Sequence, residues 1–206
     1  MISPRRYLLL KEFLVAEGYE ADFRWAEGVA SPRDPDAFGI EAAFVILNSG
    51  MKATVAQGIW ARVRPRLHAG LLIQGSGAFG HEAKAAAIDW IWANRADLWA
   101  RFLTLATPEA QLAFLEGLPW IGPVTKFHLA KNFGVDCAKP DRWLVRLADA
   151  HGVTVDDLCF GLARATGDRV GLVDLVLWRA CECGALHVDA LGIAPVAEWL
   201  LERWPE

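Results

Sequence analysis

Cysteine is scarce in this chain of 206 residues, and the four that occur follow no metal-binding pattern. One residue rather than two separates the last pair, and the overall spacing matches neither a zinc site nor an iron–sulfur cluster. We therefore expect free cytosolic thiols and no metal or other cofactor. The cysteines are Cys137, Cys159, Cys181 and Cys183.

A general excess of positive charge is also missing, because 21 Lys and Arg stand against 25 Asp and Glu, a formal net charge of −4. This balance excludes a histone-like coat of charge, so any nucleic-acid surface must be local. Long apolar runs are absent too: Lys11 and Glu12 interrupt the one at residues 7–10, which argues against a signal peptide or a membrane span. We expect a cytoplasmic monomer with no membrane partner, associated with the nucleoid if the source is bacterial.

Alternating β-branched segments, internal repeats and low-complexity tracts are absent as well, whereas helix signals are frequent. Ser3–Pro4 and Thr107–Pro108 each combine an N-cap residue with a proline at the first helical position. With 54% hydrophobic and 22% charged residues, the chain has the composition of a globular domain. The sequence therefore predicts an all-α fold.

The expected helices are separated by glycine, proline and polar links, and the glycine-rich residues 70–80 are the expected long loop. We expect the N-terminal segment to return and pack with the C-terminal helices. The helices are expected over residues 3–18, 37–47, 51–63, 81–94, 96–105 and 107–116, from 123, 142 and 154 onward, and over 168–183 and 195–204.

A tight turn between two of these helices is the most informative segment. One helix ends at Leu115-Glu116-Gly117, the turn reads Leu118-Pro119-Trp120-Ile121-Gly122, and the next helix begins at Pro123-Val124-Thr125. Gly122 has no side chain, so backbone N–H groups can approach a phosphate closely. The N-terminus of the second helix favours an anion, and such a contact is independent of DNA sequence.

An aspartate follows this turn at the start of another helix. Pro140 cannot lie inside a helix, and Asp141 is a good N-cap for a helix that begins at Arg142. Five basic and two acidic residues give residues 123–146 a net charge of +3 within an acidic chain. The positive charge is therefore concentrated where a DNA footprint needs it. The basic residues are Lys126, Lys131, Lys139, Arg142 and Arg146.

These residues resemble a known family. Leu118-Pro119-x-Ile121-Gly122-Pro123-x-Thr125, followed nineteen residues after Gly122 by Asp141, is similar to the helix-hairpin-helix (HhH-GPD) superfamily of base-excision DNA glycosylases. The resemblance is strong over residues 115–148 and weaker over 45–51. It implies one glycosylase domain over residues 1–206, built from two helical lobes with a DNA cleft between them. The helix-hairpin-helix would lie at about 107–133 and the catalytic aspartate loop and helix at 135–150.

The resemblance also implies roles for single residues. Asp141 would be the catalytic carboxylate, which stabilises positive charge on the sugar and orients a water molecule while a base of double-stranded DNA is excised. DNA-binding residues would be Trp120, Gly122, Val124, Thr125, Lys126, Lys139 and Arg142. The wedge or base pocket would draw on Asn48, Met51, Trp25 and Trp143.

Three positions depart from the family pattern. Val124 stands where bifunctional members carry a catalytic lysine, and valine cannot form a Schiff base, so the resemblance implies a monofunctional enzyme. Trp120 replaces the first glycine of the hairpin, and Gly50 stands where endonuclease III-like members carry a polar wedge.

Several alternatives stay open. The protein could be a DNA-binding module without excision, or a bifunctional lyase that uses a non-standard lysine such as Lys52 or Lys126. The ten tryptophans favour an alkylated, cationic purine as substrate. An oxidised purine and a modified pyrimidine remain alternatives.

Overall fold

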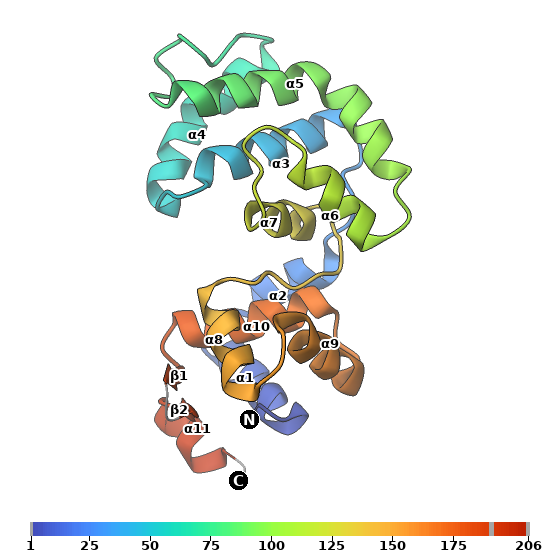
Figure 1. Cartoon of the computed structure of the whole chain (residues 1–206). Coiled ribbons are helices and arrows are strands. Elements are labelled where there is room, and N and C mark those ends of the chain that lie inside the picture. The colour runs from blue at the N-terminus through green and yellow to red at the C-terminus, as the bar shows by residue number, and fades with distance from the viewer. Residues whose placement is uncertain (1, 190–191, 205–206) are drawn as a thin grey trace. The chain divides into compact units, whose positions relative to one another are not determined.

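A computed structural model describes residues 2–189 and 192–204. Over these residues the chain forms eleven helices and one small antiparallel sheet (Figure 1), which confirms the all-α prediction. The chain divides into two compact units. The inserted unit is Ala30–Val135, and the terminal unit combines Met1–Val29 with Asp136–Glu206. The N-terminal segment therefore does return to the C-terminal helices, and two helical lobes are present as expected.

The inserted unit contains five helices around an aromatic core. Phe133 packs against Phe38 and Phe102, with ring centroids 4.7 Å and 5.2 Å apart, and all three side chains are fully buried. Tilted aromatic pairs at these separations stabilise a core beyond the area that they bury. The helices are α3 (Pro35–Asn48), α4 (Ala53–His68), α5 (Glu82–Leu103), α6 (Pro108–Glu116) and α7 (Thr125–Asn132).

Two predictions in this unit are wrong in detail. The two helices expected over residues 81–94 and 96–105 are one continuous helix, α5, over Glu82–Leu103, because neither Asn94 nor Arg95 interrupts it. Both side chains instead donate to carbonyls of the preceding turn, those of Trp90 and Trp92. Helix α4 begins two residues later than expected and continues past Pro65 to His68.

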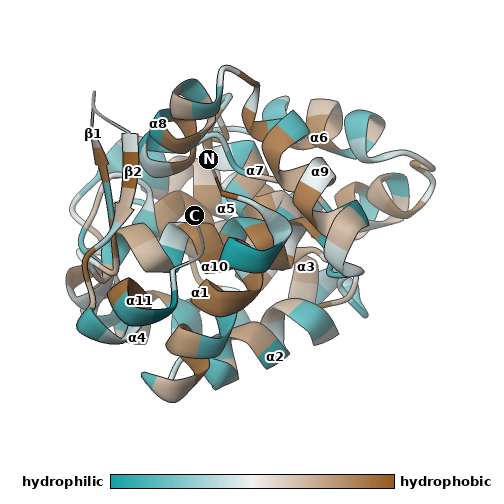
Figure 2. Ribbon diagram, turned by 90° about the horizontal axis from the view of Figure 1, so that it is seen from below, coloured by the Kyte–Doolittle hydropathy of each residue, from teal (hydrophilic) through white to brown (hydrophobic). Residues whose placement is uncertain are grey.

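The terminal unit packs its helices around α10, whose apolar residues are mostly buried. Figure 2 shows α1 and α10 largely in the hydrophobic colour. A polar cluster around Asp168 anchors α1. The Tyr7 hydroxyl donates a hydrogen bond to the Asp168 carboxylate at 2.6 Å, and the Lys11 ammonium donates to the same carboxylate at 2.9 Å. Burial, together with Asp168, raises the pKa of Tyr7, so the phenol stays protonated as the donor. The helices are α1 (Pro4–Ala16), α2 (Glu20–Gly28), α8 (Arg142–His151), α9 (Val155–Thr166), α10 (Val170–Glu182) and α11 (Glu198–Arg203).

The C-terminal part differs from the prediction. Strands β1 (Leu186–Asp189) and β2 (Gly192–Pro195) pair antiparallel, with Leu186 opposite Pro195. Pro195 therefore ends a strand instead of opening a helix, and α11 begins at Glu198. Strands of four residues are too short for an alternating pattern to stand out. Helix α2 was not predicted.

No described helix is long and apolar enough to cross a bilayer.

Candidate functional site

The turn between α6 and α7 lies in the inserted unit, and apolar side chains of the turn itself anchor it to the core. Leu118 and Ile121 are buried, and the Ile121 N–H donates to the Leu118 carbonyl at 3.1 Å. A Cβ atom added at Gly122 would have no neighbouring atom within 4 Å, and the backbone there is not left-handed. The backbone at Gly122 is therefore open on its outer side without being strained.

Helix α7 begins beside this open backbone. No side chain caps its N-terminus at Val124, and the Lys126 N–H already donates to the Gly122 carbonyl at 3.0 Å. An anion at this end of the helix would therefore meet the earlier N–H groups, those of Val124 and Thr125. Val124 is 49% exposed, and α7 begins at Thr125, two residues later than the start expected at Pro123. The Lys126 ammonium lies 2.5 Å from a Glu116 carboxylate oxygen, so its charge is already paired within the protein.

Trp120 occupies the strained position of the turn. Its φ of 65° is left-handed, and no other non-glycine residue in the described part of the chain has a positive φ. A left-handed backbone costs an L-residue roughly 1–2 kcal/mol relative to glycine. The side chain is nevertheless 45% exposed, and its ring lies edge to face with His81, with centroids 5.0 Å apart.

Asp141 lies in the terminal unit and caps α8, as expected. Its Oδ1 accepts hydrogen bonds from the backbone N–H groups of Trp143 at 2.9 Å and Leu144 at 3.2 Å. Its own N–H donates to the Lys139 carbonyl at 2.7 Å, which closes a tight turn. Oδ2 has no hydrogen-bond partner among the described residues. The positive end of the α8 dipole favours negative charge at this position, and one oxygen remains for a ligand.

Two further carboxylates fix the segment that leads to Asp141. The Lys139 N–H donates to Oδ2 of the buried Asp174 at 2.5 Å, and the Gly171 N–H donates to Oδ1 of Asp136 at 2.9 Å. Both contacts join residues 136–139 to α10. No local sequence pattern indicates these two roles, because each contact joins residues 35 positions apart.

We expect Asp174→Ala to lower the free energy of unfolding by about 1–3 kcal/mol, because the buried Lys139 N–H loses its acceptor. Asp174→Asn keeps an acceptor oxygen and should fall between the alanine variant and wild type. Urea denaturation measures the effect; an alanine variant as stable as wild type would contradict the role.

Cys181 of α10 lies near Asp141, is buried and has low reactivity. Burial raises the pKa of Cys181 to about 12, and the negative charges of Asp141 and Cys183 add to this effect. At neutral pH the thiol is therefore protonated and is a poor nucleophile.

The other predicted residues of this segment lie on α8. Arg142 is exposed, and Lys139 is half-buried just before the helix. Trp143 packs on the core of the terminal unit, and the guanidinium groups of Arg142 and Arg146 lie 5.0 Å and 5.4 Å from its ring centre. Trp25 is 49% exposed on α2 of the same unit. Trp143 and Trp25 stay predictions as pocket residues.

The turn expected to carry a wedge residue joins α3 to α4 and is fixed by a buried lysine. The Lys84 ammonium donates to the carbonyls of Leu47 at 3.2 Å and Ser49 at 2.5 Å, and burial lowers its pKa. Asn48 and Met51 are both half-buried, and Oδ1 of Asn48 is buried without a hydrogen-bond partner among the described residues. Both therefore stay candidates, and Lys84 is a positioning residue that the sequence did not indicate.

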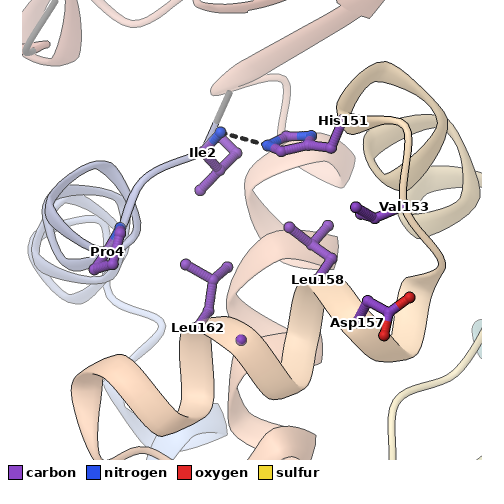
Figure 3. Close-up of a pocket in the computed structure, with 8 residues that line it drawn as sticks. Ile2, Pro4, His151, Val153, Asp157, Leu158 and Leu162 are labelled. Carbon is purple, nitrogen blue, oxygen red and sulfur yellow. Dashed lines mark hydrogen bonds between the residues drawn. The ribbon is translucent and has the colours of Figure 1, made fainter.

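A pocket of about 270 Å³ lies elsewhere in the terminal unit, between the start of the chain and α9 (Figure 3). His151 lines it and accepts a hydrogen bond from the Ile2 N–H at 2.5 Å, and burial lowers the pKa of this imidazole. The Asp157 carboxylate at its edge belongs to the capping box of Thr154 at the start of α9. Asp141 does not line this pocket, and the pocket is therefore not part of the candidate site.

No metal centre is present among the described residues, where no three metal-ligating side chains gather. The four cysteines form no disulfide, and Cys183 alone of them is exposed.

Comparison with known proteins shows the fold. No protein-family model matches the chain, and no curated protein sequence matches it. A solved structure, the 8-oxoguanine DNA glycosylase of Thermotoga maritima, is similar with a TM-score of 0.54 and 21% sequence identity. The match covers 82% of this chain and 94% of that one. The predicted resemblance is therefore confirmed at the level of the fold.

Proposed function

We propose that this protein is a monofunctional DNA glycosylase that hydrolyses the N-glycosidic bond of a damaged or modified base in double-stranded DNA. One observation carries the proposal: Asp141 caps α8 with Oδ1 and keeps Oδ2 unpaired within the described residues, nineteen residues after the open backbone of Gly122. A fold shared with an 8-oxoguanine DNA glycosylase supports it.

The proposed chemistry follows from the groups at each position. The hairpin of the inserted unit binds a phosphate through backbone N–H groups, which positions the protein without reading bases. Excision builds positive charge on the sugar as the base leaves, and the Asp141 carboxylate stabilises that charge. The same carboxylate orients a water molecule as the nucleophile.

The decisive experiment is a panel of duplexes, each with a single lesion, followed by an assay for abasic sites. The panel should include 8-oxoguanine, on which the structurally similar glycosylase acts, and alkylated purines, which the tryptophan content favours. Release of one lesion would establish the activity. Tight binding without release of any base would favour the alternative, a DNA-binding module.

We expect the abasic product to remain intact until alkali or heat cleaves the strand, because Val124 provides no amine. Borohydride treatment should therefore trap no protein–DNA adduct. Lys126 is a poor substitute nucleophile because its ammonium group is paired with Glu116, which leaves the exposed Lys52 as the other candidate.

Val124→Lys tests the position directly. Val124 is exposed and its side chain makes no cap contact, so the lysine variant should fold normally. A borohydride adduct with this variant but not with wild type would support the assignment. An adduct with wild type would overturn the monofunctional part of the proposal.

A further inference from the structure

We infer that Trp120 is a binding subsite for the flat apolar face of a nucleoside, next to the phosphate that the hairpin binds. This inference rests on the proposed DNA-binding role of the hairpin. It concerns a side chain whose position in the turn would suit glycine better, because only glycine adopts a φ of 65° without steric cost. The backbone strain therefore calls for an explanation in what the side chain does.

The exposed side of the Trp120 indole contributes little to the stability of the fold. Trp120 remains 45% exposed, and the described residues offer its ring nitrogen no hydrogen-bond acceptor. A tryptophan that served only as core would be buried, and its N–H would have a partner. A large apolar ring with an unpaired donor at the surface instead has the properties of a contact residue.

The direction of the indole is fixed by its neighbours. His81 lies against Trp120 with ring centroids 5.0 Å apart and an interplanar angle of 77°. His81 is itself held, because its Nδ1 accepts the Lys84 N–H at 3.3 Å as the cap of α5, and its ring lies 6.2 Å from the buried Phe79. The rings of Phe79, His81 and Trp120 form a row from the core to the surface. The indole is therefore already held in position before a ligand binds.

The position of Trp120 beside Gly122 indicates the class of ligand. Trp120 is two residues from Gly122, whose backbone is open, and a phosphate bound there brings its nucleoside within reach of the indole. Nucleoside surface of that kind is either a deoxyribose of an intact duplex or a base that has left the stack. Aromatic side chains bind such faces without sequence preference, and the contribution does not depend on salt.

The test compares Trp120→Gly and Trp120→Phe with wild type in DNA-binding titrations over a range of salt concentrations. The glycine variant relieves the strained backbone while losing the packing on His81, so its melting temperature should change by only a few degrees. Its affinity for DNA should fall roughly tenfold with an unchanged salt slope. The phenylalanine variant keeps a flat ring and should retain most of the affinity.

Trp90→Ala is the matched control, because Trp90 is also 45% exposed in the inserted unit but lies within α5, nine residues after the His81 that packs on Trp120. It should bind DNA as wild type does. Two substrates identify the contact: an equal loss on intact duplex and on duplex with one unpaired nucleotide indicates the sugar, and a larger loss on the latter indicates the base.

The failure of this inference is separable from failure of the proposed function. Trp120→Gly with wild-type affinity, while Gly122→Val loses affinity, would overturn the subsite and leave the hairpin as the phosphate clamp. A loss that Trp90→Ala reproduces would also overturn it. Wild-type affinity in both the Trp120 and Gly122 variants would remove the hairpin from DNA binding altogether.

Discussion

Asp141→Asn is expected to lower the rate of base release by several orders of magnitude while the protein stays folded. Asparagine caps a helix about as well as aspartate, so its side-chain oxygen can keep the contacts with the N–H groups of Trp143 and Leu144. What disappears is the negative charge that stabilises the sugar cation in the transition state. DNA affinity should stay near the wild-type value or increase, because a negative charge near the phosphates is removed.

Single-turnover excision, DNA titration and thermal unfolding measure these three properties. Asp149→Asn is the matched control, since Asp149 is an exposed carboxylate on the same helix. It should excise at the wild-type rate. Asp141→Ala adds the loss of the cap, about 1 kcal/mol of stability, and so separates capping from catalysis. A near-normal excision rate in Asp141→Asn would remove Asp141 from the catalytic role.

Local signals were sufficient to predict the elements that carry the proposed chemistry. Thr107 with Pro108 starts α6, and Asp141 caps α8, because each cap is decided by residues within one turn of the helix. The helix expected from residue 154 onward begins with the capping box of Thr154 and Asp157, which also acts within one turn. A cap acts over three residues, so a single sequence contains all the information that it needs.

The errors arise where tertiary packing overrides local preference. Asn94 and Arg95 look like a helix end, yet α5 continues because it packs along its length against α3. Helix α2 has no side-chain N-cap and gave no start signal. Its Phe23 and Ala26 are buried in the terminal unit, so packing stabilises this helix more than its own sequence does.

The supporting residues of the site could not be predicted for a related reason. Lys84 reaches carbonyls at the end of α3, Asp174 reaches the Lys139 N–H, and His81 reaches Trp120. Each contact joins residues more than 30 positions apart, and a sequence without its fold gives no distance between them. The sequence therefore indicated candidate groups for the proposed chemistry, and the structure adds what holds them in place.

Gly122→Val is expected to weaken binding to every DNA duplex by about 100-fold, with or without a lesion. A phosphate held by charge-assisted N–H bonds contributes roughly 1.5–3 kcal/mol, and a branched side chain at this position would block its approach. A Cβ at Gly122 meets no atom within 4 Å and the backbone is not left-handed, so the first carbon of the new side chain does not strain the turn.

The measurement is affinity against salt concentration on lesion-bearing and undamaged duplexes, with circular dichroism as the test of folding. Gly28→Val is the control, because Gly28 is an exposed glycine whose surroundings are equally open, at the end of α2. Lys139→Ala should lower the salt slope by about one unit if its ammonium meets a phosphate, whereas Lys126→Ala should change it less, since Glu116 already pairs that charge. A folded Gly122→Val variant that binds both duplexes as wild type does would make the hairpin a purely structural turn.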